Sequence, residues 1–197
     1  MRSTRVTTPD PAGGAPVAAA DGPLLTIRDL SVDFAVEGRT VQAVRDAGLT
    51  VLPGRTTALV GESGSGKSVT ALSVLRLLPG SARVRGEIIF EGRELTGLDE
   101  ASLREVRGGR IGMIFQEPMT SLNPLHTVGR QIAESVGLHR PGADARARTL
   151  ELLDLVGIPD PASRLASFPH QLSGGQRQRV MIAMALANDP ALLIADE

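Results

Sequence analysis

The chain has 197 residues, of which 42% are hydrophobic and 22% are charged, and its formal net charge is −1. This length allows one well-buried core and favours a single domain, while the charge balance gives no reason to expect a nucleic-acid partner. Because the sequence contains no cysteine, it excludes a disulfide framework, a thiolate metal site and a cysteine nucleophile.

The sequence also lacks the patterns of a histidine metal site and of a membrane segment. His126, His139 and His170 show no metal-ligand spacing, so we interpret them as surface or packing residues. No apolar run approaches the roughly 20 residues that span a bilayer. The first residues include Arg2 and Arg5 but no hydrophobic stretch of a secretory signal. We therefore expect a soluble, cytoplasmic protein.

The N-terminal part of the chain changes character near residue 23. Residues 1–22 are rich in Ala, Pro, Gly and Thr without periodicity, which predicts a disordered tail. Short strand-like runs then follow at 24–30, 32–36, 40–44 and 49–52. They predict an antiparallel β-subdomain. Phe34 lies in one of these strands, where its ring could stack on a nucleobase, although a strand phenylalanine is more often a core residue.

Gly61–Ser68 reads Gly-Glu-Ser-Gly-Ser-Gly-Lys-Ser, between an apolar run at 57–60 and a helical pattern at 69–78. The spacing G-x-x-x-x-G-K-[ST] in this strand–loop–helix context predicts a phosphate-binding loop. Glycines let successive N–H groups turn inward, and the helix adds the positive end of its dipole. We predict that nucleotide is bound by Gly61, Glu62, Ser63, Gly64, Ser65, Gly66, Lys67, Ser68 and Val69.

Two residues of this loop have more specific predicted roles. Lys67 is the only lysine of the chain, and its compact ammonium is expected to contact phosphate in a way that a planar guanidinium cannot reproduce. The hydroxyl of Ser68 is expected to ligate Mg²⁺.

The central part of the chain begins with a turn at Pro79-Gly80, a strand at 87–90 and a short helix at 98–106. A buried strand at 110–115 ends on Gln116, in a place where it could reach Mg²⁺ or an attacking water. An ordinary structural role for this glutamine is equally compatible with the pattern. Residues 117–175 are predicted as a mainly helical insertion, with helices at 128–136 and 143–156.

Leu172-Ser-Gly-Gly-Gln176 precedes a further helix at 177–187. Ser173 is a good N-cap, and the two glycines leave the first N–H groups of the helix open, so this is a second anion-receptive helix N-terminus. We interpret Met181 and Met184 as core residues. Arg177 and Arg179 are expected on a solvated or subunit-contact face.

The last segment, 191–195, is continuously apolar, as expected of a central parallel strand, and is followed by Asp196 and Glu197. Two carboxylates at the end of a buried strand are costly unless a cation or a proton-transfer step uses them. We predict that Asp196 holds Mg²⁺ through its water shell and that Glu197 is the general base that polarises the attacking water. The alternative is a strand that simply ends in solvent.

In this order, the motifs resemble the nucleotide-binding subunit of ABC transporters over roughly residues 24–197. Gly61–Ser68, Ile114–Pro124 and Phe168–Arg179 resemble the branch that serves dipeptide, oligopeptide, nickel and glutathione importers. The resemblance implies an α/β fold over residues 23–197. It consists of a P-loop NTPase core with a mostly parallel sheet and flanking helices, an antiparallel β-subdomain and an inserted helical subdomain, truncated at the C-terminus.

The resemblance also implies roles for individual residues. Phe34 matches the aromatic residue that stacks on adenine, and Gln116 matches the glutamine that touches Mg²⁺ and senses the membrane partner. Ser173, Gly174, Gly175 and Gln176 match the signature motif, which clasps the γ-phosphate held by the opposite subunit. A two-fold dimer would thereby form two composite sites, each with one ATP between two copies.

The implied function is that of an ATPase subunit, with ATP and Mg²⁺, that powers import of di- or oligopeptides from the cytoplasmic face of the membrane. Its expected partners are a second ABC subunit, transmembrane permease subunits and, indirectly, an extracytoplasmic solute-binding protein, with no nucleic acid. Because the family continues beyond Glu197, we expect these 197 residues alone to bind nucleotide weakly and not to turn over.

Two other functions are compatible with parts of the pattern. A soluble ABC protein of DNA repair or the ribosome would carry long coiled coils or two cassettes per chain. A P-loop kinase would have no use for residues 172–176.

Overall fold

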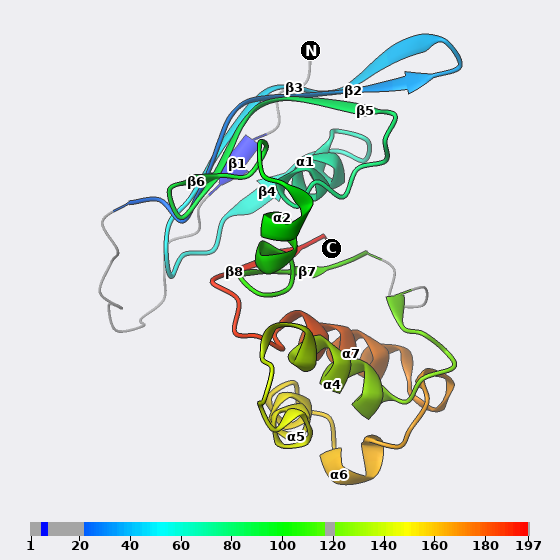
Figure 1. The fold of residues 1–197 in the computed structure, drawn as a ribbon. Coiled ribbons are helices and arrows are strands. Elements are labelled where there is room, and N and C mark those ends of the chain that lie inside the picture. The colour runs from blue at the N-terminus through cyan, green and yellow to red at the C-terminus, as the bar shows by residue number, and fades with distance from the viewer. Residues whose placement is uncertain (1–4, 8–21, 117–120, 197) are drawn as a thin grey trace. The chain divides into compact units, whose positions relative to one another are not determined.

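The structure is a computed structural model that describes residues 5–7, 22–116 and 121–196. The chain divides into two compact units, Met1–Asp99 and Glu100–Glu197. In Figure 1 the first unit contains β1 to β6 and α1, and the second contains β7, β8 and the helices from α2 to α7. Within the part of the chain that the structure describes, no helix is both long enough and apolar enough to cross a bilayer.

The first unit is built on a four-stranded sheet in the order β3-β2-β5-β6. All neighbouring pairs are antiparallel, and the strands are β2 (Leu25–Val36), β3 (Arg39–Val51), β5 (Ala82–Phe90) and β6 (Arg93–Glu94). The predicted antiparallel β-subdomain is therefore confirmed. The two runs expected at 40–44 and 49–52 form one strand, because register shifts between Ile27 and Asp33 on β2 absorb the irregular segment between them.

A second pair of strands precedes the first helix. β4 (Ala58–Val60) pairs antiparallel with β1 (Arg5–Thr7). The strand β1 falls inside the segment 1–22 that was predicted as a disordered tail, whereas residues 1–4 and 8–21 of that segment lie outside the described residues. A three-residue strand is too short to give an alternating pattern in the sequence, and its edge pairing with β4 is a long-range contact.

Helix α1 (Lys67–Val74) follows β4 and is shorter than the pattern at 69–78 suggests. Its end is defined at Leu75 and Arg76, since Arg76 has a left-handed φ of 51° and its N–H donates to the carbonyl of Ser73 at 3.0 Å. This backbone reversal stops the helix before the apolar pattern ends.

The second unit combines a short parallel pair of strands with a helical group. Strands β7 (Ile111–Ile114) and β8 (Leu192–Ala195) are parallel, with Ile111 opposite Leu192 and Ile114 opposite Ala195. The helices are α2 (Glu100–Val106), α4 (Val128–His139), α5 (Ala145–Leu155), α6 (Pro161–Arg164) and α7 (Gly174–Ala185), with a 3₁₀ turn at Pro169–Gln171.

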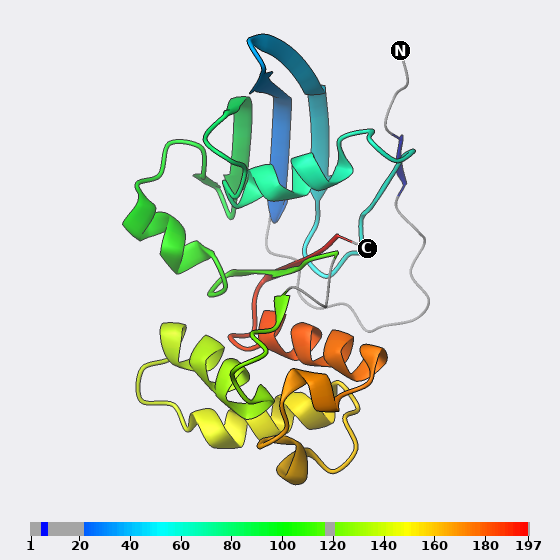
Figure 2. The ribbon, with the colours of Figure 1, turned by 90° about the vertical axis from the view of Figure 1, so that its right-hand side faces the viewer.

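Helices α4, α5 and α7 pack around one apolar core, and Figure 2 shows them side by side. Each contributes one buried stripe, as expected of amphipathic helices. The buried side chains include Val128, Ile132, Val136, Leu152, Leu153, Val180 and Met181. Met184 is partly buried against the same core, so the interpretation of both methionines as core residues is confirmed.

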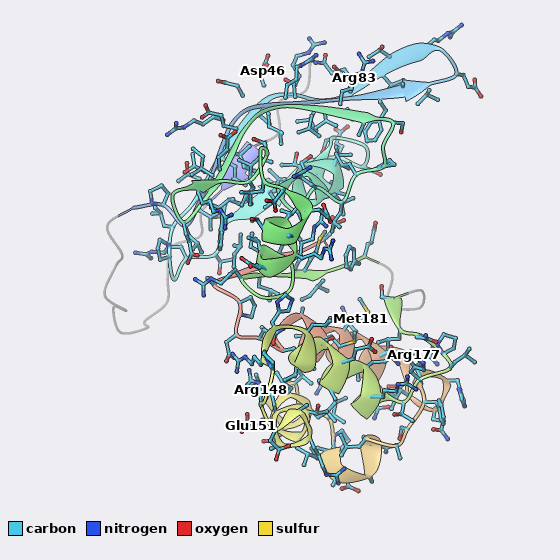
Figure 3. All side chains as sticks on the ribbon, viewed as in Figure 1. Asp46, Arg83, Arg148, Glu151, Arg177 and Met181 are labelled. Atoms are coloured by element: carbon cyan, nitrogen blue, oxygen red, sulfur yellow. The ribbon has the colours of Figure 1, made fainter. Side chains whose placement is uncertain are left out.

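The turn between α7 and β8 is held by polar contacts from α4 and α5. Asp189, with a left-handed φ of 50°, bonds Arg140 at 2.6 Å and also bonds Arg148. Arg148 projects from α5 near Glu151 (Figure 3), and its Nε donates to the carbonyl of Ala187 at 3.3 Å. Asn188 is buried and donates to the carbonyls of Gly108 and Ser135 at 3.1 and 2.9 Å. The start of β8 is thus tied to three other elements.

The ion pairs of Asp189 predict a specific pH dependence of stability. The hydrogen bond from Arg140 and the charge of Arg148 outweigh desolvation and hold the pKa of Asp189 below its ordinary value of 3.8. A depressed folded-state pKa adds stability above pH 3.8, and this contribution is lost as the pH falls through the folded-state pKa. Because the Asp189 side chain is 62% exposed, we expect Asp189→Asn to cost less than about 1 kcal/mol.

The measurement is the free energy of unfolding of wild type and Asp189→Asn between pH 7 and pH 3. The gap between the two proteins should close below pH 3.8. A gap that stays constant down to pH 3 would show that the charge of Asp189 contributes nothing.

Candidate nucleotide-binding site

The loop between β4 and α1 takes a backbone path that requires glycine. Gly64 and Gly66 both have left-handed φ values, 79° and 93°. A Cβ built on Gly66 would lie 2.7 Å from the carbonyl oxygen of Ala43 and 3.0 Å from Cγ2 of Val44, whereas one built on Gly64 meets nothing within 4 Å. The loop therefore turns sharply at both glycines and touches β3 at the second.

These two glycines make a matched pair for mutation. Gly64→Ala introduces only the left-handed strain, about 1–2 kcal/mol. Gly66→Ala adds the contact with the Ala43 carbonyl, so we expect it to destabilise the protein by about 2–4 kcal/mol and to abolish nucleotide binding. Urea unfolding of the two variants measures the difference. Equal losses of stability in the two variants would mean that the close approach of Gly66 to β3 adds nothing to the cost of the substitution.

Helix α1 begins at Lys67 with its N-terminus unblocked. Gly66 is the N-cap, no side chain caps the helix, and the first turn contains no acidic residue. The open N–H groups and the helix dipole favour an anion at this end. Lys67 curls back over the loop, where its Nζ donates to the carbonyls of Gly61 and Glu62 at 2.9 and 3.0 Å. Its ammonium is therefore held above the loop, at the place where a phosphate would lie in a backbone nest.

The phosphate-binding loop forms one wall of a cavity of about 1260 Å³. The opposite wall is the 42–49 segment of β3, and Ile27, Leu59, Val60 and Thr70 complete the lining. This volume exceeds what a small-molecule ligand needs. The β3 wall was not recognised from the sequence, because its approach to the loop is a long-range contact. The one local signal is Gly66 itself, which leaves space for the strand.

Phe34 lies on β2, half-buried, opposite Val41 on β3 and Ala82 on β5. Val32, two residues before Phe34 on β2 and opposite Val44, is fully buried, whereas Val41, the β3 residue opposite Phe34, is 52% exposed. Phe34 therefore stands at the edge of an apolar surface that begins at the loop wall. It is not among the residues that line the cavity.

The second predicted phosphate-receptive end is also a well-formed helix N-terminus. Ser173 is the N-cap of α7, and its Oγ accepts a hydrogen bond from the N–H of Gln176 at 3.3 Å. In return, Oε1 of Gln176 accepts from the N–H of Ser173 at 3.0 Å. This capping box confirms the predicted cap. The capping box uses the side chains of Ser173 and Gln176. It does not involve the N–H groups of Gly174 and Gly175, which lie at the exposed helix end.

The glycines of this second end differ from those of the first. Gly174 and Gly175 have no left-handed φ, and a Cβ on either would meet nothing within 4 Å. Among the described residues, no contact requires glycine at these positions, where it lowers helix stability.

Strands β7 and β8 bring two predicted metal-site residues to one edge. Because Ile114 faces Ala195 in a parallel register, Gln116 and Asp196 follow neighbouring strand ends, and the Asp196 N–H donates to the carbonyl of Ile114 at 3.0 Å. Glu197 lies outside the described residues. Ser68 belongs to the first unit, so a metal site shared by all three stays a prediction. Among the described residues, no three His, Cys, Asp or Glu side chains gather in a metal-binding cluster.

The family follows from a comparison of the whole sequence with known families. Residues 44–197, which include the phosphate-binding loop, the capping box of α7 and both parallel strands, match the profile described as ABC transporter. The chain belongs to the ABC transporter family.

Several curated proteins resemble this ABC chain closely. It is 61% identical over 179 residues to the peptidoglycan transport ATP-binding protein YejF of Agrobacterium fabrum, which covers 89% of this chain and 33% of that protein. It is 53% identical over 178 residues to the oligopeptide transport ATP-binding protein OppD of Mycobacterium tuberculosis, with 89% and 29% covered. For the probable peptide ABC transporter ATP-binding protein y4tR of Sinorhizobium fredii, the identity is 56%, with 88% and 53% covered. The ABC chain thus spans about half or less of the length of these relatives.

Solved structures of ABC cassettes share the fold. The dimeric post-hydrolysis structure of the ATP-binding cassette MJ0796, bound to ADP and Pi, has a TM-score of 0.74 at 28% identity and covers 87% of this chain and 72% of that one. For cbiO1 of Clostridium perfringens, part of the ABC transporter complex cbiONQ, the TM-score is 0.70 at 26% identity, with 89% and 65% covered. The predicted P-loop NTPase fold is confirmed. Among the described residues, β7 and β8 form the one parallel pair of named strands and the other four pairs are antiparallel, so the mostly parallel sheet that was predicted is not seen in this part of the chain.

Proposed function

We propose that this chain forms the ATP-binding part of an ATPase subunit that powers import of di- or oligopeptides through an ABC transporter. ATP binds in the cavity beside Gly61–Ser68, with its phosphates in the loop and on the N-terminus of α1. Relatives named for oligopeptide and peptide transport, at 53% and 56% identity, support this choice of solute.

The observation that carries the proposal is the presence of two phosphate-receptive helix ends in one chain. Gly64 and Gly66 of the first end are explained by contacts and torsions within the chain, and Gly174 and Gly175 of the second are not. One nucleotide needs a single phosphate-binding loop. In a two-fold dimer, Ser173–Gln176 of each copy contacts the γ-phosphate that the other copy holds, and this explains the open glycines. The dimeric state of a cassette of the same fold supports this arrangement.

The chain's own residues divide the chemistry as follows. Lys67 and the loop N–H groups bind the phosphates and stabilise charge that develops on them. Ser68, Gln116 and Asp196 offer hydroxyl, amide and carboxylate oxygens, which are the donors that Mg²⁺ prefers, and the bound ion would neutralise phosphate charge. Glu197 takes the proton from the attacking water. Val69 adds a backbone N–H in the first turn of α1.

Phe34 holds the adenine ring by stacking, at the open edge of the apolar surface that runs from Val32 to Val41. The buried Oγ of Ser65, which has no hydrogen-bond partner among the described residues, fits a loop whose remaining partner is the nucleotide.

The subunit works with a second ABC subunit and with permease subunits, and indirectly with an extracytoplasmic solute-binding protein. It is bound peripherally at the cytoplasmic face of the membrane. ATP closes the dimer, and hydrolysis removes the γ-phosphate that both copies grip, so that the dimer opens.

The test is purification of the full-length protein from detergent-solubilised membranes, with sequencing of the proteins that copurify and an ATPase assay. We expect permease subunits to copurify, and peptides presented with the solute-binding protein to stimulate ATP hydrolysis. Recovery of ribosomes or DNA in a salt-dependent complex would contradict the proposal and support the soluble alternative.

A further inference from the structure

The segment that leads into α7 is a sequence of fixed turns. The N–H of Phe168 donates to Oε1 of Gln171 at 2.8 Å, and the Gln171 N–H donates back to the Phe168 carbonyl at 2.9 Å. The rings of Phe168 and His170 stack with their centroids 5.7 Å apart. Leu172 follows, 4% exposed and anchored in the helical core. The chain therefore reaches the N-cap Ser173 along one defined path.

Arg177 closes this path onto the helix. It lies in α7 (Figure 3), and its Nε donates to the carbonyl of Pro169 at 2.7 Å. The same carbonyl accepts from the N–H of Leu172 at 3.1 Å. The Arg177 side chain thereby spans eight residues and joins α7 to the turn in front of it, with Ser173–Gln176 enclosed between the two ends. Arg177 is partly buried while it makes this bond, and its predicted place on a solvated or subunit-contact face stays a prediction.

Arg179 also donates to backbone carbonyls, but those of the segment that follows α5. Its Nη1 donates to the carbonyls of Val156 and Gly157 at 3.0 and 2.7 Å, at the end of α5. It thus caps α5 and makes no such bond to the segment in front of Ser173 among the described residues. The two arginines are therefore suited to a matched comparison by mutation. Each joins α7 to backbone carbonyls, but only the bond of Arg177 lies next to the signature motif.

We propose that Arg177 is the positioning residue of the signature motif: it fixes the direction in which the N–H groups of Gly174 and Gly175 face a partner's nucleotide. Arg177 acts through the Pro169 carbonyl and does not touch the nucleotide. This inference rests on the proposed shared site. Its physical basis is that a group misplaced by about 1 Å in a preorganised site can lower the rate by about a hundredfold.

The experiment compares Arg177→Met, Arg177→Lys and Arg179→Met in the full-length protein. Three quantities are measured: kcat and KM for ATP, binding of a fluorescent ATP analogue to the P-loop, and the midpoint of thermal unfolding. For Arg177→Met we expect kcat to fall by a factor of about 10 or more, with unchanged binding of the analogue. Arg177→Lys, whose ammonium can reach one carbonyl, should recover part of the rate. Arg179→Met should keep its kcat while its unfolding midpoint falls at least as far.

The inference is overturned if Arg177→Met keeps the wild-type kcat, or if both Met variants lose activity in proportion to their loss of stability. If Arg177→Met does not fold, Arg177→Lys decides the question by the same readouts. Gly175→Ala separates this inference from the proposed function. Inactive Gly175→Ala beside active Arg177→Met overturns the inference alone, whereas fully active Gly175→Ala overturns the shared site and with it the inference.

Discussion

Replacement of Lys67 by arginine is expected to lower ATP hydrolysis by a factor of about 100 or more, although the net charge is unchanged. The ammonium of Lys67 lies within 3.0 Å of two loop carbonyls, in the curl of Gly61–Ser68. A guanidinium is planar and wider, so it cannot follow the same curl or contact a phosphate as a point charge. The assay is the rate of phosphate release at saturating ATP and Mg²⁺.

Two controls make this result specific. The unfolding midpoint of Lys67→Arg should stay within about 2 °C of wild type, because the side chain is only half-buried and its contacts are exposed hydrogen bonds. Arg76→Lys, an exchange at the end of the same helix, should keep full activity. Wild-type hydrolysis by Lys67→Arg would remove the argument that this position needs a lysine.

Gly175→Ala is expected to give a stable protein with little or no ATPase activity. Its Cβ would meet nothing within the described chain, and alanine favours the helix over glycine by about 1 kcal/mol. The added methyl group instead lies at the helix end where we propose that the partner's γ-phosphate binds. We expect kcat to fall by a factor of about 100, together with loss of ATP-dependent dimerisation in light scattering.

Gly137 provides the matched control. It lies inside α4 and is exposed, and a Cβ added to it would likewise meet nothing within 4 Å. Gly137→Ala should raise stability by up to about 1 kcal/mol and leave ATP hydrolysis unchanged. If Gly175→Ala behaves like Gly137→Ala in both respects, the glycines of α7 do not contact a nucleotide.

Much of the local structure follows from sequence pattern, because it depends on neighbouring residues. The cap at Ser173, the strand β8 and the helix–loop transition at Gly66 need only local chemistry. The extent of α1 could not be predicted, since the reversal at Arg76 interrupts an apolar pattern that continues past it. The pairing of β1 with β4 and the unbroken course of β3 depend on partners distant in the sequence.

The same distinction applies to the candidate site. The phosphate-binding loop Gly61–Ser68 can be recognised from the sequence, because the spacing of its glycines, lysine and serine determines the geometry that binds phosphate. The β3 wall and the bond from Arg177 to Pro169 are not, since both join segments whose approach the pattern does not encode. Arg177 and Arg179 alternate with Gln178 on a helix, a pattern that is typical of solvated faces. In the structure both also donate to backbone carbonyls, while Arg177 is partly buried and Arg179 is exposed.

The central claim is that one ATP is shared between two copies of this chain. Its most direct test is a crystal structure of the full-length protein with Mg²⁺ and a non-hydrolysable ATP analogue. We expect the N–H groups of Gly174 and Gly175 from one copy within hydrogen-bonding distance of the γ-phosphate that Gly61–Ser68 of the other copy holds. Residues 172–176 packed away from every triphosphate, in a protein that is fully active as a lone protomer, would contradict the account.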